Sequence, residues 1–389
     1  GGRLPIWELS SNETNCMIGY HVVSVIWDAY HKGIRGFDEE KAYEAMTKIA
    51  THYSDYEGEG LSLKLKESAR KGAADADALE SYCKYGYVRS DDSHESVSKT
   101  LEYAYDDWCI AQMANALGKK KDYEYYTNRS QSWKNVYDPT TGFMRARKNG
   151  CLYEPFSPYT VDNNYTEANA WQYSFSVPHD LDGLIDIMQG GSDHFKKKLN
   201  ELFAAKQQTQ GREQADITGL IGQYAHGNEP SHHIAFLYNS TAWGEYNTAL
   251  ITNQIAKEFY KNSPDGLIGN EDCGQMSAWY VFKSLGFYPV CPGELSFQVT
   301  EPLFNNITIN HSLNIAKTDT TSHGNKTFCT KDTWTDIKYD DLFAKNNISI
   351  FSLDMKHPAG DWFPQEKKNK TVPFIKNGVR IVSAHAQKW

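Results

Sequence analysis

The sequence lacks several features that would place it in a familiar class. No apolar run reaches the roughly 18 residues that a membrane-spanning helix needs, so no segment is expected to cross a membrane. Lys and Arg number 40 against 49 Asp and Glu, and the net charge of −9 argues against nucleic acid or an anionic membrane as a partner. The seven cysteines include no C-x-x-C pair, which excludes a common zinc-ribbon pattern and gives no disulfide framework.

The chain also lacks an initiator Met and a signal peptide. It starts with Gly1-Gly2-Arg3 and enters a motif-rich segment at once, so we expect it to be part of a longer protein that continues on the N-terminal side. Nine Asn-x-Ser/Thr triplets favour a secreted glycoprotein, although an Asn-rich sequence also produces them by chance. We therefore expect a secreted, periplasmic or lumenal protein.

Aromatic residues are abundant, since 25 Tyr, 17 Phe and 10 Trp make up 13% of the 389 residues. Their flat apolar faces with polar edges suit stacking on sugar rings, and the same side chains also fill hydrophobic cores. The length allows one large domain or two.

From about residue 14 to 286 the sequence shows mainly helical patterns. Apolar residues recur at helical spacing from Met17 to Tyr30, behind the candidate N-caps Ser10, Ser11 and Asn12. Helices in series, joined by loops without intervening strands, favour an α/α toroid with its site in the loops at one end, and a plain helical bundle is the alternative. The other predicted helices span residues 39–53 behind Asp38, 97–117 between Ser93 or Ser96 and Gly118, 122–137, 193–203, 230–238, 242–260, and 273–285 before Gly286.

The pattern changes after Tyr288-Pro289-Val290. Apolar and polar residues alternate at 297–299, 307–309, 348–353 and 379–382, which predicts strands, and residues 354–363 are expected to form a loop. We therefore predict a mainly α fold in two parts. Residues 1–288 form a catalytic α/α-toroid region, incomplete at its N-terminus, and residues 289–389 form a β-rich segment that pairs with strands outside this sequence.

The segment Gly266–Tyr280 places two adjacent carboxylates, Glu271 and Asp272, in a Gly-rich turn before an apolar helical run. Such a turn is accessible, and a helix N-terminus tolerates negative charge. Asp272 either caps this helix or works as a catalytic carboxylate. Glu271 could take the same role, and the spacing alone does not choose between them.

A second carboxylate, Glu167, precedes the aromatic residues Trp171, Tyr173 and Phe175. Glycosidic hydrolysis needs two carboxyl groups that flank one bond. Partly apolar surroundings would raise the pKa of Glu167 and keep it protonated, as a general acid requires, while a polar turn would keep Asp272 ionised as a general base. The alternative is that Glu167 is only an acid in the first turn of a helix.

Two further clusters contain residue types that bind sugars or metals. His179 and Asp180 could hold adjacent sugar hydroxyls, or Asp180 could cap a turn beside a hydrogen-bonded His. In the run 226–233, the oxygens of Asn228 and Glu229 suit calcium, and the neighbouring histidines could bond substrate. Adjacent histidines do not match the i, i+4 pair of a zinc helix.

Together these segments resemble the family 92 glycoside hydrolases, which are calcium-dependent exo-acting α-mannosidases. The resemblance covers the stretches 4–21, 167–180, 226–233 and 266–289, in that order. It implies an (α/α)6 catalytic domain packed against an N-terminal β-sandwich that lies outside this sequence. The β-rich tail is similar to the family's C-terminal segment.

The resemblance also implies a mechanism of single displacement with inversion, in which Glu167 is the acid and Asp272 the base. Family members often carry an acid two positions before the base, where this chain has Asn270, so Asp272 is left to activate water alone. A Ca²⁺ ion is expected near Asn228 and Glu229. The expected sugar contacts are Trp7, Glu8, Trp171, His179, Asp180, His232, His233 and Gln275.

The implied substrates are mannose-containing glycans of the N-glycan or mannan type, and α-1,2 is the linkage we expect the enzyme to cleave. Two other functions stay open. One is another α-glycosidase on the same toroid, of the glucosidase or trehalase kind, and the other is a catalytically inactive carbohydrate-binding fragment.

Overall fold

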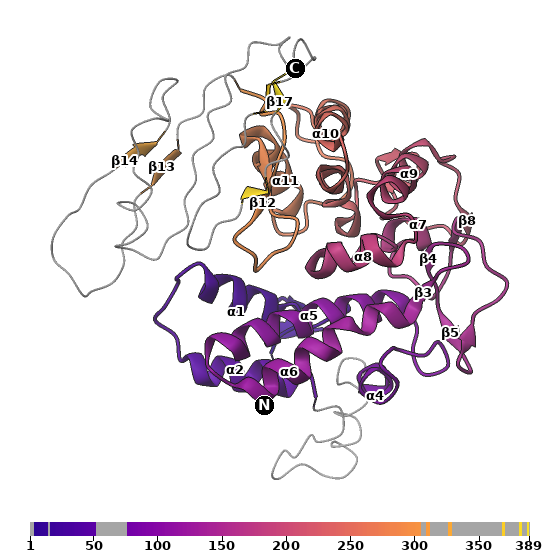
Figure 1. Cartoon of the computed structure of the whole chain (residues 1–389), viewed down its shortest axis with the longest axis vertical. Helices are drawn as coiled ribbons and strands as arrows, with labels where there is room; N and C mark the ends of the chain where they lie inside the picture. Colours follow the sequence, from indigo (N-terminus) through magenta and orange to yellow (C-terminus); the bar gives the residue numbers. More distant parts are fainter. Residues whose placement is uncertain are drawn as a thin grey trace. The chain divides into compact units, whose positions relative to one another are not determined.

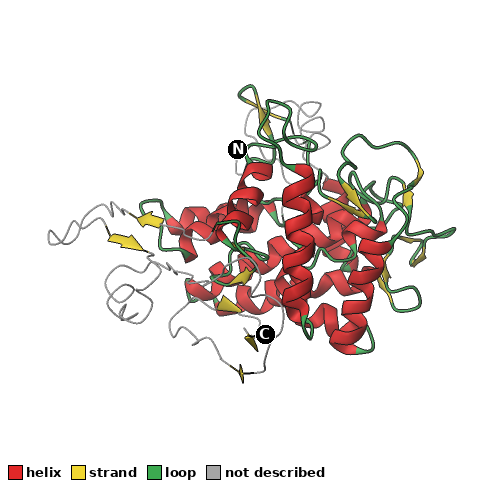
Figure 2. Ribbon diagram, turned by 90° about the horizontal axis from the view of Figure 1, so that it is seen from above, coloured by secondary structure: helices red, strands yellow, loops and turns green. Residues whose placement is uncertain are grey.

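The computed structural model describes residues 4–14, 16–51 and 76–304, and the backbone of five short strands between residues 309 and 388. Helices are the main regular structure in this part, while every strand has only two or three residues (Figure 2). Among these residues no helix is long and apolar enough to cross a membrane. The chain divides into two compact units. The first contains residues up to Ile234, Ser263–Asn270 and Cys291–Glu294, and the second contains Ala235–Asn262, Glu271–Val290 and the residues from Leu295 onwards.

The first unit is organised around one long helix, α5 (Ser96–Ala116), of which 16 of 21 residues are buried. A helix that is buried on nearly all sides must be covered by neighbours all round. Four helices, α1 (Val22–His31), α2 (Glu39–Ile49), α4 (Ala76–Tyr85) and α6 (Lys120–Arg129), pack against α5 (Figure 1). The remaining helices are η1 (Ser130–Val136), α7 (Ala170–Tyr173), η2 (Pro178–Asp180), α8 (Leu181–Ile187), α9 (Gly191–Ala204) and η3 (Glu229–Ser231).

Short strand pairs connect these helices. The antiparallel pairs are β1 (Glu8–Leu9) with β2 (Asn12–Glu13), β3 (Tyr137–Asp138) with β4 (Phe143–Met144), β5 (Arg147–Lys148) with β6 (Cys151–Leu152), and β9 (Leu220–Ile221) with β10 (Tyr224–Ala225). One parallel pair joins β7 (Thr160–Val161) to β8 (Gln210–Gly211).

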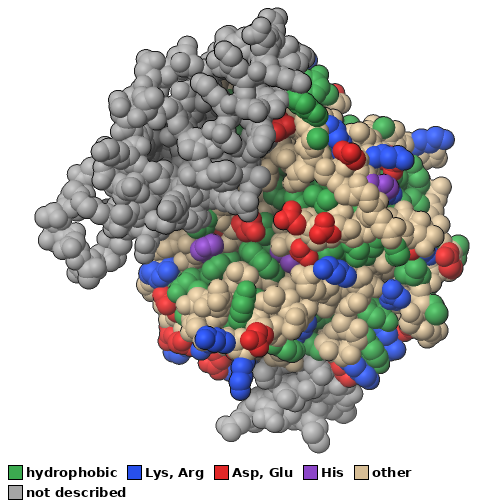
Figure 3. All heavy atoms as spheres, viewed as in Figure 1, with side chains coloured by type: hydrophobic (Ala, Val, Ile, Leu, Met, Phe, Trp, Pro, Cys, Tyr) green, Lys and Arg blue, Asp and Glu red, His purple; other side chains and the backbone are tan. Residues whose placement is uncertain are grey.

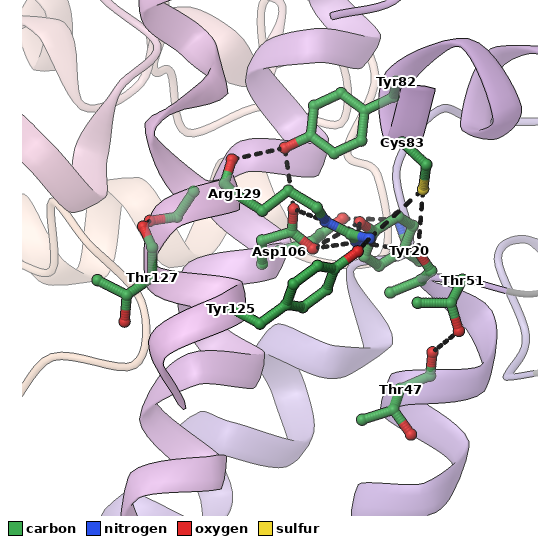
Figure 4. A network of polar contacts seen from close by, with 12 residues as sticks. Tyr20, Thr47, Thr51, Tyr82, Cys83, Asp106, Tyr125, Thr127 and Arg129 are labelled. Carbon is green, nitrogen blue, oxygen red and sulfur yellow. Dashed lines mark hydrogen bonds and ion pairs between the residues drawn. The ribbon is translucent and has the colours of Figure 1, made fainter. Parts of the chain in front are cut away.

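A buried ion pair ties the helices of the first unit together (Figure 4). Arg129 donates to both carboxylate oxygens of Asp107, at 2.6 Å from Nε and 2.5 Å from Nη2. The hydroxyls of Tyr20 and Tyr82 donate to the same carboxylate at 3.1 and 2.9 Å, and Nη2 of Arg129 also donates to the carbonyl oxygen of Ala50 at 2.9 Å. These groups come from α4, α5, α6, the C-terminus of α2 and the residues before α1, so one charge pair fixes five segments.

The second unit has fewer elements, and its core is aromatic. Tyr260 stacks on Trp279 at 5.7 Å between ring centroids, and Phe236 stacks on Tyr288 at 4.4 Å. Its elements are η4 (Ile234–Ser240), which starts at the end of the first unit, α10 (Gly244–Phe259), α11 (Gln275–Leu285), β11 (Phe287–Tyr288), β12 (Phe297–Val299), β13 (Ile309–His311), β14 (Lys326–Phe328), β15 (Lys368–Asn369), β16 (Ile381–Val382) and β17 (Gln387–Lys388). Strand β12 pairs with β11 antiparallel and with β16 parallel, and two further antiparallel pairs join β13 to β14 and β15 to β17.

Several predicted helices are confirmed, because local signals set their ends. Asp38 caps α2 by accepting the amide of Lys41 at 3.0 Å, although this helix ends at Ile49 and not at the predicted residue 53. Gly118 follows α5 with φ +72°, and Gly286 is the C-cap of α11 with φ +88°. Helices α9 and α10 lie within two residues of the predicted ranges.

Other predictions about the first 290 residues are wrong. Ser10 and Ser11 do not cap a helix, because φ values of +51° and +64° place them in the two-residue turn between β1 and β2. Glu95, at φ +58°, is the N-cap of α5 in place of Ser93 or Ser96. The predicted helix 122–137 is α-helical only as far as Arg129, where the 3-10 helix η1 follows, and the range 230–238 is largely 3-10 helix. Short strands also interrupt the helical series.

In the C-terminal part, β12 confirms the predicted strand 297–299, and β16 lies within the predicted strand 379–382. Strand β13 overlaps the predicted strand 307–309 at Ile309 only. The predicted strand 348–353 and the loop 354–363 lie outside the described residues. The boundary between residues 288 and 289, and the pairing of the tail with strands outside this sequence, stay predictions.

Candidate active site

Glu167 lies in a turn that the surrounding residues hold firmly. Its φ is +51°, and its carbonyl oxygen accepts the side-chain amide of Asn228 at 3.2 Å. The preceding amide of Thr166 donates to Ser98 Oγ of α5 at 2.9 Å. Asn169 caps α7 by accepting the amide of Trp171 at 3.0 Å, so Glu167 stands before this helix. The alternative that it is a first-turn helix acid is wrong.

In the second unit, Glu271 and Asp272 have different roles. Glu271 accepts the amide of Ser277 at 3.1 Å and the Ser277 hydroxyl at 3.0 Å, and thereby satisfies one backbone amide in the first turn of α11. Asp272 is half-buried, and its carboxylate makes no hydrogen bond or ion pair with any described residue. The alternative that Asp272 is the helix cap is therefore wrong, and of the two acids it is the one available to a ligand.

Both candidate carboxylates have strained backbone conformations. Glu167 at φ +51° and Asp272 at φ +46° lie in the left-handed region, and Cys273 and Gly274 continue the turn at +55° and +98°. A residue other than glycine costs about 1–3 kcal/mol in such a sparsely populated conformation, and residues of this kind cluster at functional sites.

Three loops of the first unit meet beside Glu167. Gly227, next to Asn228, donates its amide to the carbonyl oxygen of Thr218 at 3.0 Å. Gly269 lies so close that a Cβ on it would come within 2.9 Å of the Gly227 carbonyl oxygen. The next residue, Asn270, donates its side-chain amide to Asp216 at 3.3 Å. The predicted acid and the segment directly before Asp272 in the sequence thus share neighbours.

Asp216 is a residue that the sequence reasoning missed. Besides Asn270, the side-chain amide of Gln214 donates to its carboxylate at 2.6 Å. The only signal in the sequence is an Asp followed by Thr218 and Gly219 shortly before the run 226–233.

The histidines of the run 226–233 are held by neighbouring oxygens. Burial lowers the pKa of His226 to about 2, helped by His232, and the ring lies 2.8 Å from the Tyr224 hydroxyl. Nε2 of His232 lies 2.9 Å from the carbonyl oxygen of His226, and Nε2 of His233 lies 2.8 Å from that of Phe175. Burial also lowers the pKa of His233. Their predicted contacts with a sugar stay predictions.

Asp180 has the capping role that was the alternative to sugar binding. It accepts the amide of Gly183 at 3.1 Å at the start of α8, and Lys134 lies 3.8 Å away. His179 lies 3.0 Å from the Ser130 carbonyl oxygen, and burial lowers its pKa to about 4. On the face shown in Figure 3, acidic side chains gather over α8. Sugar contacts of His179 and Asp180 stay predictions.

The other predicted sugar contacts differ in exposure. Trp7 is half-buried just before β1, and Glu8 is exposed on that strand. Trp171 is buried edge-on against Phe143, with 4.7 Å between the ring centroids, so packing accounts for its position. Gln275 is the half-buried first residue of α11. Binding of sugar by these residues stays a prediction.

The oxygen donors of Asn228 and Glu229 fit calcium in kind, because Ca²⁺ binds carboxylate and amide oxygens. Asn228 directs its amide nitrogen to the Glu167 carbonyl oxygen, which leaves its side-chain oxygen to face elsewhere. Within the described ranges no group of three or more His, Cys, Asp or Glu could hold a metal ion. A calcium site here would therefore need amide, backbone or sugar oxygens to complete the six to eight ligands that are typical of Ca²⁺.

Comparison with known proteins defines the class as glycoside hydrolase. The sequence profile of the glycosyl hydrolase family 92 catalytic domain matches residues 1–355, and the chain belongs to this family. It is 27% identical to an uncharacterized secreted glycosidase of Arthroderma benhamiae, over 94% of this chain and 45% of that protein.

Two solved structures are similar to this one. The family GH92 α-mannosidase BT3965 of Bacteroides thetaiotaomicron is 43% identical with a TM-score of 0.68, over 79% of this chain and 37% of that one. The family GH92 inverting mannosidase BT2199 of the same species is 33% identical with a TM-score of 0.66, over 81% of this chain and 42% of that one. The chain thus spans less than half the length of these relatives. The predicted fold class, an α/α toroid followed by a β-containing segment, is confirmed.

Proposed function

We propose that this chain is the catalytic region of an exo-acting, inverting α-mannosidase that removes terminal α-linked mannose from glycans. The solved relative BT3965 is named an α-mannosidase and was also solved in complex with mannoimidazole, and the solved relative BT2199 is named an inverting mannosidase. The proposed substrates are N-glycans or mannans, with α-1,2 as the expected linkage. Secretion is proposed from the name of the fungal relative.

The observation that carries the proposal is that both candidate carboxylates have a left-handed backbone, which among the described residues they share with six other non-glycine residues. The φ value is +51° for Glu167 in the first unit and +46° for Asp272 in the second. Glycine would adopt this conformation at a lower cost in free energy. The carboxylate of Asp272 also makes no hydrogen bond or ion pair with the described residues, while its neighbour Glu271 bonds the first turn of α11. Both features are expected of groups selected for chemistry.

In the proposed reaction Glu167 is protonated and gives its proton to the leaving glycosidic oxygen. Asp272 is ionised and takes a proton from the water that attacks the anomeric carbon on the opposite face. After one turnover Glu167 is ionised and Asp272 is protonated, and exchange with solvent restores both. Asn228 and Glu229 would hold Ca²⁺, which supplies a charge that binds adjacent sugar hydroxyls.

The test uses the natural protein that carries this chain and an aryl α-mannoside as substrate. Glu167→Gln and Asp272→Asn should each lower kcat by about 10²-fold or more, because each removes one proton-transfer group. Glu271→Gln is the matched control, since it should change stability more than turnover. Unchanged hydrolysis by either of the first two variants would sink the assignment.

Assays of the same protein distinguish the proposed mannosidase from the two alternative functions. Hydrolysis of α-glucosides, unaffected by a calcium chelator, would favour the glucosidase or trehalase kind of enzyme. Sugar binding seen by NMR without any product would favour a carbohydrate-binding protein.

A further inference from the structure

Asp216 stands on a short rigid turn of the first unit. The amide of Ile217 donates to the carbonyl oxygen of Gln214 at 3.3 Å, and the amide of Thr218 donates to that of Asp216 at 2.9 Å. The carboxylate is half-buried, and no Lys or Arg among the described residues pairs with it. Two neutral amides, from Gln214 and Asn270, fix its orientation without neutralising its charge.

Asn270 is held at the point where the chain enters the acidic turn. The residue before it, Gly269, has φ +84° and lies against Gly227, where even a methyl group would come within 2.9 Å of a carbonyl oxygen. Its own side chain is anchored to Asp216 at 3.3 Å. Two consecutive residues, Gly269 and Asn270, are therefore held in place. The next residues in the sequence are Glu271 and Asp272.

We propose that Asp216 is a positioning residue for the base Asp272, acting through its hydrogen bond to Asn270. This inference rests on the proposed function, since it assigns a role in the same reaction. The contact requires one acceptor and one donor. An amide at position 270 satisfies this requirement, whereas a carboxylate there would face the carboxylate of Asp216 at about the same 3.3 Å.

Substitutions at positions 216 and 270 can either break this hydrogen bond or keep it. Asn270→Asp creates the repulsive pair and Asp216→Ala removes the acceptor, so each should lower kcat about tenfold or more, because a small misplacement of a catalytic group is costly. KM should change less than about threefold. Asp216→Asn keeps an acceptor oxygen and should stay near wild-type.

The double variant Asp216→Asn with Asn270→Asp exchanges donor and acceptor. It should recover most of the kcat that Asn270→Asp loses, which a merely structural loss would not do. Gln254→Glu is a matched control, because Gln254 donates to Glu258 at 3.1 Å on the exposed face of α10 and the change creates the same like-charge contact there. It should leave kcat unchanged.

The measurements are kcat and KM on an aryl α-mannoside and the urea midpoint of each variant. Wild-type turnover in Asn270→Asp, or a double variant no better than it, overturns the inference. A loss in Asp216→Asn as large as in Asp216→Ala also overturns it, because the charge itself would then be required. A wild-type protein without activity contradicts the proposed function instead, and the urea midpoints then decide whether positions 216 and 270 are coupled.

Discussion

At the scale of single residues, Arg129 neutralises the buried carboxylate of Asp107 in the first unit. Arg129→Met would leave the buried carboxylate of Asp107 without its cation, which costs about 3–5 kcal/mol in the free energy of unfolding. Urea unfolding measures this loss. The paired change of Arg129→Met with Asp107→Leu removes both charges and should cost less than the single change. An Arg129→Met protein within about 1 kcal/mol of wild-type would contradict this role.

His21 makes the stability of the first unit depend on pH. Its ring nitrogens lie 3.0 Å from Asp106 and 2.9 Å from Glu102. Desolvation of the ring lowers the pKa of His21, but its side chain is still 43% exposed, and the two carboxylates outweigh this effect and raise the pKa well above 6.5. The two contacts of protonated His21 therefore stabilise the folded protein fully below pH 6.5. This stabilisation is lost as the pH rises through the pKa that His21 has in the folded protein.

The measurement is urea unfolding of wild-type and His21→Gln over a pH series. The difference in stability between them should shrink above neutrality. The matched control is His179→Gln. The pKa of His179 is lowered to about 4, so its contribution has the opposite slope and is lost as the pH falls below 6.5. A constant difference between wild-type and His21→Gln across the series would refute the linkage.

At the scale of an element, helix α11 contains a fully buried lysine, Lys283, whose ammonium donates to the Glu301 carbonyl oxygen. Burial lowers its pKa to about 8, against 10.5 for an ordinary lysine. The unfolded chain binds the proton more tightly, so folding stability should rise by about 2 kcal/mol between pH 8 and pH 10.

Lys283→Met should remove this rise, and Lys257→Met, on the exposed face of α10, should keep it. Denaturant unfolding between pH 7 and pH 10 measures both variants. A Lys283→Met protein that still gains stability with rising pH would show that another group titrates.

Elements differed in how well the sequence predicted them. The start of α2 and the C-terminal ends of α5 and α11 were predictable, because Asp38, Gly118 and Gly286 act on their own neighbours. The hairpin at Ser10 and Ser11 was not, because the same residues also suit a helix cap.

At the scale of the whole molecule, only the parts of the candidate site that lie in continuous sequence motifs were predictable. Glu167 and the acidic turn were found in this way, but the choice between Glu271 and Asp272 depends on which side chain reaches Ser277. The contact of Asp216 with Asn270 joins residues 54 positions apart, so it could not be predicted from a local sequence pattern. Family membership supports the hydrolase class, while the stereochemistry and the metal are proposals.

The most direct test of the central claim is the anomeric form of the first product. Hydrolysis of an aryl α-mannoside by the natural protein that carries this chain can be followed by proton NMR, before mutarotation mixes the anomers. Inversion by Glu167 and Asp272 predicts that β-mannose is released first. Release of α-mannose first would contradict an acid–base pair that acts by single displacement.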